Sequence, residues 1–269
     1  MRITIFHNSN PQSLHITADL SQKLKQNGFS VVEKNPDIVI TVGGDGTLLS
    51  AFHHYADALD HIRFVGVHTG HLGFYTDWRD YELDELVDSL RHDNRTQVTY
   101  PLLDVSVQYV GAAQATHYLA LNEATLKCIS ATLVADIYIH DELFESFRGD
   151  GLCISTPTGS TAYNKSIGGA VLHPSLEAIQ LAEIASINNR VFRTLSAPIV
   201  ISPNEWIDIY PEAKAAEYLM TVDRAVPKRR PIKSIRYRIA DQRIAFAGNR
   251  HMHFWNRVED AFIGEKQQP

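Results

Sequence analysis

A glycine-rich turn with a carboxylate at its centre is the feature of this sequence best suited to chemistry. Residues 43 to 47 have the sequence GGDGT and directly follow the apolar stretch DIVITV at residues 37 to 42, which is typical of a buried strand. Glycines let the backbone approach an oxygen-rich ligand closely, and the N–H groups at the start of a helix favour negative charge. A candidate phosphate loop therefore consists of Gly43, Gly44, Gly46 and Thr47.

Asp45 distinguishes this turn from two common nucleotide-binding loops. No Lys-Ser or Lys-Thr pair follows the glycines, which excludes a Walker A loop, and Leu49 stands where the dinucleotide fingerprint has its third glycine. A carboxylate repels phosphate, so Asp45 needs a compensating role. It can accept a proton from an attacking hydroxyl or hold Mg²⁺ against the phosphates. The alternative is a plain strand-to-helix turn in which Asp45 caps the helix.

Two further polar segments are candidates for binding a nucleotide. Residues 148 to 169 (RGDGLCISTPTGSTAYNKSIGG) gather hydroxyl side chains, which suit ribose or phosphate, around one aromatic residue, Tyr163. Asn122 and Glu123 follow an apolar strand; an asparagine can pair with an adenine edge, and a carboxylate can accept from ribose hydroxyls. The alternatives are a polar surface loop and a solvated strand end.

The histidines do not indicate a metal centre. None of the 13 histidines has an HExxH or facial-triad spacing, so we expect no transition-metal site built by the protein. His68 and His71, within GVHTGHLGFY at residues 66 to 75, can contact phosphate or serve as structural hydrogen-bonding residues.

Alternating periodicities predict the elements that position these residues. Over residues 1–100, strands alternate with helices, which predicts a Rossmann-like three-layer α/β domain with a mostly parallel sheet. The strands are expected at 3–6, 29–32, 37–42 and 64–67, and the helices at 13–27 (capped by Ser13), 47–59 and 81–91.

Residues 101–249 have a different pattern, in which many short strands are separated by turns. This predicts an all-β, sandwich-like C-terminal domain, interrupted by one helix-like pattern at 176–187. The apolar tail at 250–269 is expected to return to the first domain. The strands are expected at 102–109, 116–121, 132–140, 142–147, 152–155, 199–201, 206–210, 219–223, 234–240 and 243–247.

Composition excludes several classes of protein. The formal net charge of −6 argues against a general nucleic-acid binder. The two cysteines, Cys128 and Cys153, support neither a disulfide framework nor a zinc knuckle. The N-terminus has the pattern of a strand and not of a signal peptide, and no apolar stretch approaches the length of a membrane span. We therefore expect a cytoplasmic protein without membrane partners.

Taken together, these motifs resemble the NAD kinase family. GGDGT, Asn122-Glu123 and TPTGSTAYNKSIGG (156–169) occur in that family's order and at its usual separations, and GHLGFY (70–75) resembles its LGF motif. The resemblance implies that ATP, or in some members polyphosphate, phosphorylates the adenosine ribose 2′-hydroxyl of NAD with Mg²⁺ carried by the donor phosphates. It also implies a site between the two domains, and a homotetramer in which a neighbouring subunit completes the nicotinamide side.

The same resemblance assigns roles to individual residues. Asp45 is the expected base or orienter of the 2′-hydroxyl, with Gly46 beside it. Asp150 and Ala185 are expected near the nicotinamide. The remaining NAD-binding residues, most of them around the adenosine, are Asn122, Glu123, Arg148, Thr158, Thr161, Ala162, Tyr163 and Ser166.

Two other functions are compatible with the motifs. GGDGT also occurs in diacylglycerol and sphingosine kinases, and a dinucleotide sensor without catalysis would use the same binding residues. The absence of an amphipathic run suited to a membrane surface argues against the lipid kinase, and the intact Asp45 argues against the sensor. Donor choice between ATP and polyphosphate, preference for NAD or NADH, feedback regulation and the roles of His68 and His71 stay open.

Overall fold

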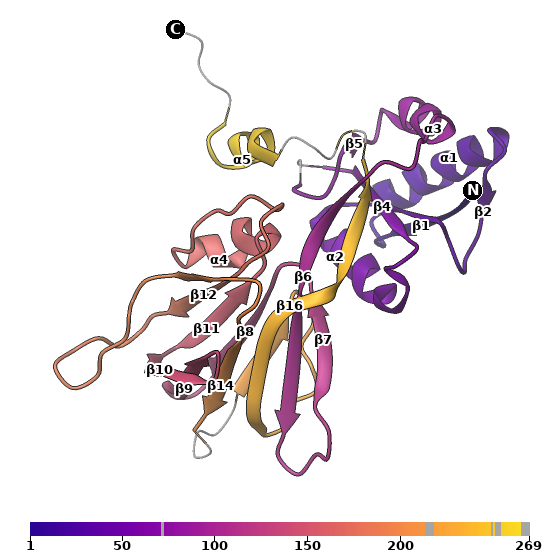
Figure 1. Cartoon of the computed structure of the whole chain (residues 1–269). Coiled ribbons are helices and arrows are strands. Elements are labelled where there is room, and N and C mark those ends of the chain that lie inside the picture. Colours follow the sequence, from indigo (N-terminus) through magenta and orange to yellow (C-terminus); the bar gives the residue numbers. More distant parts are fainter. Residues whose placement is uncertain (71–72, 213–217, 249, 251–253, 265–269) are drawn as a thin grey trace, which may run out of the picture. The chain divides into compact units, whose positions relative to one another are not determined.

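The computed structural model describes residues 1–70, 73–212, 218–248, 250 and 254–264; His71, His251 and His253 lie outside the described residues. The chain forms two compact units, unit 1 (Met1–Tyr100 with Arg243–Pro269) and unit 2 (Pro101–Gln242). Two long strands, β6 (Gln97–Tyr109) and β16 (Ile232–Ala247), each continue from one unit into the other (Figure 1).

Unit 1 is built on a parallel sheet. Its strands follow the order β2-β1-β3-β4, all parallel, and β5 and the end of β16 also pair in parallel with β4. Every residue of β3 is buried, as expected for a central strand covered on both faces. The strands are β1 (Arg2–His7), β2 (Ser30–Val31), β3 (Ile38–Val42), β4 (Arg63–His68) and β5 (Trp78–Arg79).

Helices cover both faces of this sheet. Two of them, α1 and α3, share one hydrophobic core with Ile38, Ile40 and Val42 of β3. Because successive strand residues face opposite sides, Val39 and Thr41 face the other way, and α2 packs against β3 and β1. The predicted three-layer α/β fold is confirmed. The helices are α1 (Pro11–Gln26), α2 (Asp45–His54), η1 (Ala56–Ala58), α3 (Leu83–Arg91) and α5 (Phe254–Phe262).

The first helix begins earlier than predicted. Its N-cap is Asn10, whose side chain accepts from the N–H of Gln12, and Pro11 occupies the first turn. Ser13 was predicted to cap the helix, but it lies buried inside it. The helix ends at Gln26, one residue before the predicted end, and Gly28 follows in the left-handed region at φ 81°.

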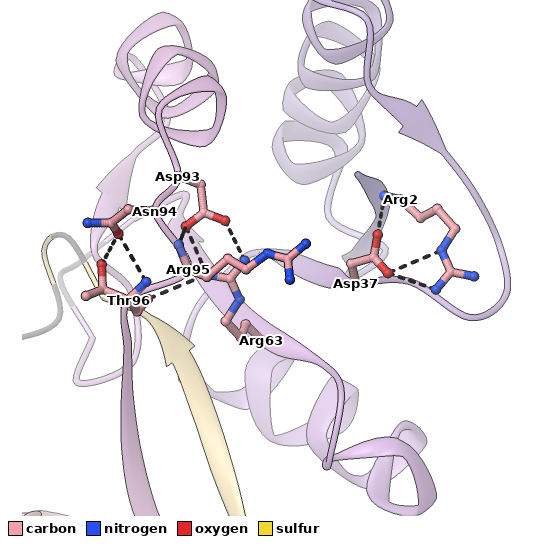
Figure 2. A network of polar contacts seen from close by, with 7 residues as sticks. All are labelled: Arg2, Asp37, Arg63, Asp93, Asn94, Arg95 and Thr96. Carbon is pink, nitrogen blue, oxygen red and sulfur yellow. Dashed lines mark hydrogen bonds and ion pairs between the residues drawn. The ribbon is translucent and has the colours of Figure 1, made fainter.

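Two arginine–aspartate pairs fasten the strand ends of unit 1 (Figure 2). Arg63, at the start of β4, holds Asp93 just after α3 through contacts of 2.9 and 2.5 Å. Arg2, at the start of β1, holds Asp37 just before β3 at 2.8 Å. Only the first pair is substantially shielded, because its side chains are 12% and 9% exposed against 49% and 42% for the second.

Unit 2 is a sandwich of two sheets. One contains β10-β9-β14-β16 with β6 and β7, and the other has the antiparallel order β13-β12-β11-β8-β15. Their facing sides share one core, to which Val105, Phe147 and Tyr237 contribute from the first sheet and Leu126 and Ile154 from the second. The predicted β-sandwich is confirmed. The strands not yet given are β7 (Thr116–Ala120), β8 (Glu123–Cys128), β9 (Leu133–Ile139), β10 (Glu142–Gly149), β11 (Gly151–Ser155), β12 (Ile179–Ile184), β13 (Ile199–Ile201), β14 (Ile207–Pro211) and β15 (Tyr218–Val222).

Three local predictions in this unit need correction. The helix expected at 176–187 is wrong, because this segment contains β12, which pairs with β11 on one side and β13 on the other. The strands expected at 234–240 and 243–247 form one continuous strand, β16. The polar segment after β11 is not an open loop but contains η2 (Thr158–Thr161) and α4 (Tyr163–Ser166). None of the helices in the described residues is long and apolar enough to cross a membrane.

Candidate active site

The GGDGT turn joins the buried strand β3 to helix α2. Gly43 has φ 151°, and a Cβ at this position would lie 2.2 Å from Thr47 Oγ1 and 2.8 Å from Asn8 Nδ2, so only glycine fits. Its N–H donates to the carbonyl of Val67 at 2.9 Å, which ties the turn to the end of β4. The shape of the turn is therefore held by contacts within the protein.

Asp45 is the first residue of α2, and its carboxylate turns toward a neighbouring loop. The backbone N–H of Phe74 donates to Oδ2 at 2.9 Å, and that of Tyr75 donates to Oδ1 at 3.0 Å. A Cβ on Gly73 would lie 2.2 Å from Oδ1, so the loop approaches closely only because residue 73 is glycine. The helix is capped by Gly44 without a side-chain bond, so the alternative in which Asp45 caps the helix is wrong.

Two other polar residues near this turn are buried, and the Nε2 atom of one of them, His68, has no hydrogen-bond partner among the described residues. Thr47, predicted as part of the phosphate loop, is buried, and its hydroxyl accepts from Asn8 Nδ2 at 3.2 Å. His68 is buried at the end of β4 with its Nδ1 atom 3.0 Å from the carbonyl of Gly70.

In unit 2, Asn122 and Glu123 lie where β8 begins, and both are buried. Asp223 accepts from the N–H groups of Asn122 at 2.7 Å and of Glu123 at 3.2 Å. On the other side, the carbonyl of Asn122 accepts from the N–H of Thr156 at 2.9 Å, and a Cβ on Gly159 would lie 2.0 Å from that carbonyl oxygen. The backbone around this pair is therefore held from two directions.

The Glu123 carboxyl group lies in an environment that favours its neutral form. Burial and the nearby charge of Asp223 raise its pKa from 4.5 to about 8, against the opposing effect of the Tyr163 N–H. Among the described residues, neither Glu123 Oε2 nor the hydroxyl of Thr158 has a hydrogen-bond partner, although both atoms are buried. Buried polar atoms usually have partners, so these two are suited to contact a polar ligand.

Tyr163 opens α4, and Lys127 of β8 holds its side chain. Lys127 Nζ donates to the phenol oxygen at 2.7 Å and lies 4.3 Å from the ring centroid. Thr161 donates its hydroxyl to the carbonyl of Thr158, and the exposed Ser166 donates to that of Tyr163. Ala162 is the half-buried residue between η2 and α4.

Arg148, Asp150 and Ala185 come together at the junction of β10, β11 and β12. The N–H of Asp150 donates to the carbonyl of Ile184 at 3.0 Å, and the carbonyl of Arg148 accepts from Ile187 at 2.7 Å. The Arg148 guanidinium lies 4.2 Å from the ring centroid of Phe192. Ala185 is exposed and has φ 46°, a conformation uncommon for residues other than glycine.

The predicted site residues thus fall into two groups. Asp45 and the GGDGT turn belong to unit 1, and the predicted NAD-binding residues other than Gly46 belong to unit 2. The sequence did not point to Lys127 or to the N–H groups of Phe74 and Tyr75. Lys127 gave no signal because its partner is 36 residues away, and the only indication of the loop at 73–75 was its resemblance to the LGF motif.

Family models match both parts of the chain. Residues 6–95 match the ATP-NAD kinase N-terminal domain, and residues 121–237 match the ATP-NAD kinase C-terminal domain. An NAD kinase of Lacticaseibacillus paracasei is 60% identical over 266 residues, covering 99% of this chain and 100% of the relative. An NAD kinase of Enterococcus faecalis is 58% identical, covering 98% of this chain and 100% of the relative.

Solved structures share the fold at much lower identity. A yeast NADH kinase in complex with NADH has a TM-score of 0.84 at 17% identity and covers 100% of this chain and 89% of its own. An NAD kinase of Archaeoglobus fulgidus in complex with ATP has a TM-score of 0.76 at 21% identity and covers 96% of this chain and 99% of its own. From the two matched domains and the full-length identity to NAD kinases, it follows that the chain belongs to the ATP-NAD kinase family.

Proposed function

We propose that this chain phosphorylates the 2′-hydroxyl of the adenosine ribose of NAD to make NADP, with ATP as phosphoryl donor and Asp45 as the group that receives the hydroxyl proton. Membership of the ATP-NAD kinase family supports this reaction. The role of Asp45 is supported by the contacts of its carboxylate at the start of α2, which accepts hydrogen bonds from the backbone N–H groups of Phe74 and Tyr75.

The bonds made by Asp45 suit a general base. Each carboxylate oxygen accepts one N–H bond, and each has a second lone pair that can accept the proton of a hydroxyl. Two N–H donors fix the plane of the carboxylate, and a fixed geometry is what phosphoryl transfer chiefly requires. The first N–H groups of α2, in the turn built by Gly43 and Gly44, are suited to the donor phosphates.

The NAD-binding residues of unit 2 would hold the dinucleotide by its two ends. Asn122 and Glu123 would bind the adenosine part, and a neutral Glu123 can both donate to and accept from a ribose diol. Gly46 is a further proposed NAD-binding residue. Asp150 and Ala185 would lie toward the nicotinamide, and Arg148, which lies at the same junction of β10, β11 and β12, would also bind NAD. The other adenosine-binding residues are Thr158, Thr161, Ala162, Tyr163 and Ser166.

A divalent cation, Mg²⁺, is part of this proposal. Among the described residues, no group of three or more His, Cys, Asp or Glu side chains could hold a metal ion by itself. The residues therefore fit a cation that arrives on ATP and is held by the donor phosphates and water, which leaves the carboxylate of Asp45 to receive the hydroxyl proton. When bound, Mg²⁺ neutralises charge on the donor phosphates.

We also propose a cytoplasmic homotetramer in which a neighbouring subunit completes the nicotinamide side of the site, with no nucleic-acid or membrane partner. Supporting this, Asp150 and Ala185 are both exposed in the single chain, so the nicotinamide side that they are proposed to line is accessible to a neighbouring subunit. The net charge of −6 disfavours nucleic acid.

One assay tests the reaction. The purified chain is incubated with ATP, Mg²⁺ and NAD, and NADP is detected with a dehydrogenase specific for the 2′-phosphate. We expect steady formation of NADP. Tight NAD binding without NADP would indicate the sensor, and phosphorylated diacylglycerol or sphingosine in parallel reactions would indicate the lipid kinase.

A further inference from the structure

Helix α5 contacts the loop at residues 73–77, which holds the carboxylate of Asp45. Phe74 lies 6.4 Å from Phe254 and 5.6 Å from Phe262, measured between ring centroids, so α5 covers this loop with two aromatic rings. Between them along the helix, Arg257 donates one guanidinium nitrogen to the carbonyl of Phe74 and the other to the carboxylate of Asp77. The helix therefore contacts the loop through both apolar and charged groups.

The bond from Arg257 to Phe74 acts on the peptide group that also contacts Asp45. The carbonyl of Phe74 and the N–H of Tyr75 belong to one peptide unit, and the N–H end donates to Asp45 Oδ1 at 3.0 Å. A trans peptide is planar, so its C=O and N–H point in opposite directions. Fixing the carbonyl with a cation therefore fixes the direction of the N–H bond, and hydrogen bonds in such a chain strengthen one another.

Arg257 is well placed to fix this peptide. Its side chain is 11% exposed and that of Asp77 is 3% exposed, so solvent screens their ion pair little. The planar fork of a guanidinium can reach two acceptors in a set geometry, which the ammonium of a lysine cannot reproduce. Asp77 is in turn anchored to the sheet, because its N–H donates to the carbonyl of Gly66 in β4 at 3.0 Å.

We propose that Arg257 is a positioning residue for catalysis, which acts on Asp45 through the Phe74–Tyr75 peptide and not by contact with either substrate. This inference rests on the proposed function of Asp45 as the base. It assigns to the C-terminal helix a role in phosphoryl transfer: α5 sets the orientation of the carboxylate that receives the 2′-hydroxyl proton.

The test is a double-mutant cycle between Arg257→Gln and Asp45→Asn, with kcat and the KM values for NAD and ATP measured for each variant. We expect Arg257→Gln to lower kcat by roughly 10- to 100-fold, the range expected for losing one or two hydrogen bonds to a charged group, with both KM values unchanged. Arg257→Lys should recover part of this loss. In the Asp45→Asn background, Arg257→Gln should lower kcat less than about twofold, because the residue through which it acts is already lost.

Two controls separate this role from a general effect on folding. Arg250→Gln removes another arginine of unit 1, which pairs with Glu82 and stacks on Trp78. Because these contacts do not include the Phe74–Tyr75 peptide, kcat should not change. Asp77→Asn removes the carboxylate that pairs with Arg257, with little change in volume, and should reproduce the loss of kcat. This variant provides the test if Arg257→Gln fails to fold.

The possible outcomes are distinguishable. A rise in KM with kcat unchanged for Arg257→Gln, or the same loss of kcat in both backgrounds, would overturn the role of Arg257 and leave that of Asp45 intact. Normal turnover by Asp45→Asn would overturn the proposed function and this inference together.

Discussion

Replacing Gly73 by alanine tests the geometry around Asp45 with a single added methyl group. The new Cβ would lie 2.2 Å from Asp45 Oδ1 and 2.7 Å from Cγ. Ordinary van der Waals contact begins near 3.4 Å, so the carboxylate or the loop must move by about 1 Å. A displacement of about 1 Å costs on the order of 100-fold in rate when geometry limits the reaction. We therefore expect Gly73→Ala to lower kcat by about 100-fold.

Steady-state kinetics with NAD and with ATP, together with thermal unfolding, measure this effect. The KM values should change little, because the methyl group meets the carboxylate and not the NAD-binding residues of unit 2. The matched control is Gly70→Ala in the same loop, where a Cβ would meet nothing within 4 Å and kcat should be normal. If Gly73→Ala retained kcat within about twofold of the original chain, the position of the Asp45 carboxylate would not limit the reaction, and the reasoning would fail.

Three further substitutions test other parts of the account. Lys127→Met removes the 2.7 Å hydrogen bond to the Tyr163 phenol, so the KM for NAD should rise roughly tenfold at near-normal kcat. Substitution of an exposed lysine, Lys233→Met, is the control. An unchanged KM for NAD in Lys127→Met would argue against Tyr163 as a binding residue. Burial raises the pKa of Glu123 from 4.5 to about 8, so the folded state binds the proton more tightly and the stabilisation is present at low pH and lost as pH rises through that window. Urea denaturation measures this as the difference in unfolding free energy between the original chain and Glu123→Gln. As pH rises from 4.5 to about 8, this difference should shift against the original chain by up to about 1.4 kcal/mol per pH unit. A difference that does not change with pH would contradict the raised pKa. Arg63→Met leaves the charge of Asp93 shielded from solvent and without its ion-pair partner, and should lower the unfolding free energy by about 3 kcal/mol. Arg2→Met breaks an exposed ion pair and should lower it by less than about 1 kcal/mol. Equal losses would show that shielding from solvent does not set the contribution of these pairs.

Much of the architecture could be predicted from local patterns. The β-branched run before GGDGT predicted the central strand β3, and alternating helices and strands predicted the parallel sheet, because these signals lie within one element. The segment at 176–187 could not be predicted in the same way. Its apolar spacing suits a helix, and the strand β12 is favoured only because β11 and β13 lie on either side of it.

The candidate site divides along the same lines. Asp45 was identified because glycines surround it in the sequence. Asn122, Glu123 and Tyr163 were identified because their segments carry polar and aromatic groups suited to a nucleotide and resemble a family pattern. The groups that hold these residues come from distant segments: Phe74 lies 29 residues from Asp45, and Asp223 lies 101 residues from Asn122. Contacts of this kind depend on how the sheets bring segments together, and no local pattern encodes them.

The central claim is that Asp45 acts in the chemical step and not in binding. Its most direct test is to measure, for Asp45→Asn, both kcat for NADP formation and the Kd for NAD by calorimetry. The account predicts a loss in kcat of roughly 100-fold or more, the usual scale for a general base, with the Kd for NAD unchanged. Near-normal turnover, or a loss of activity explained entirely by weaker NAD binding, would contradict it.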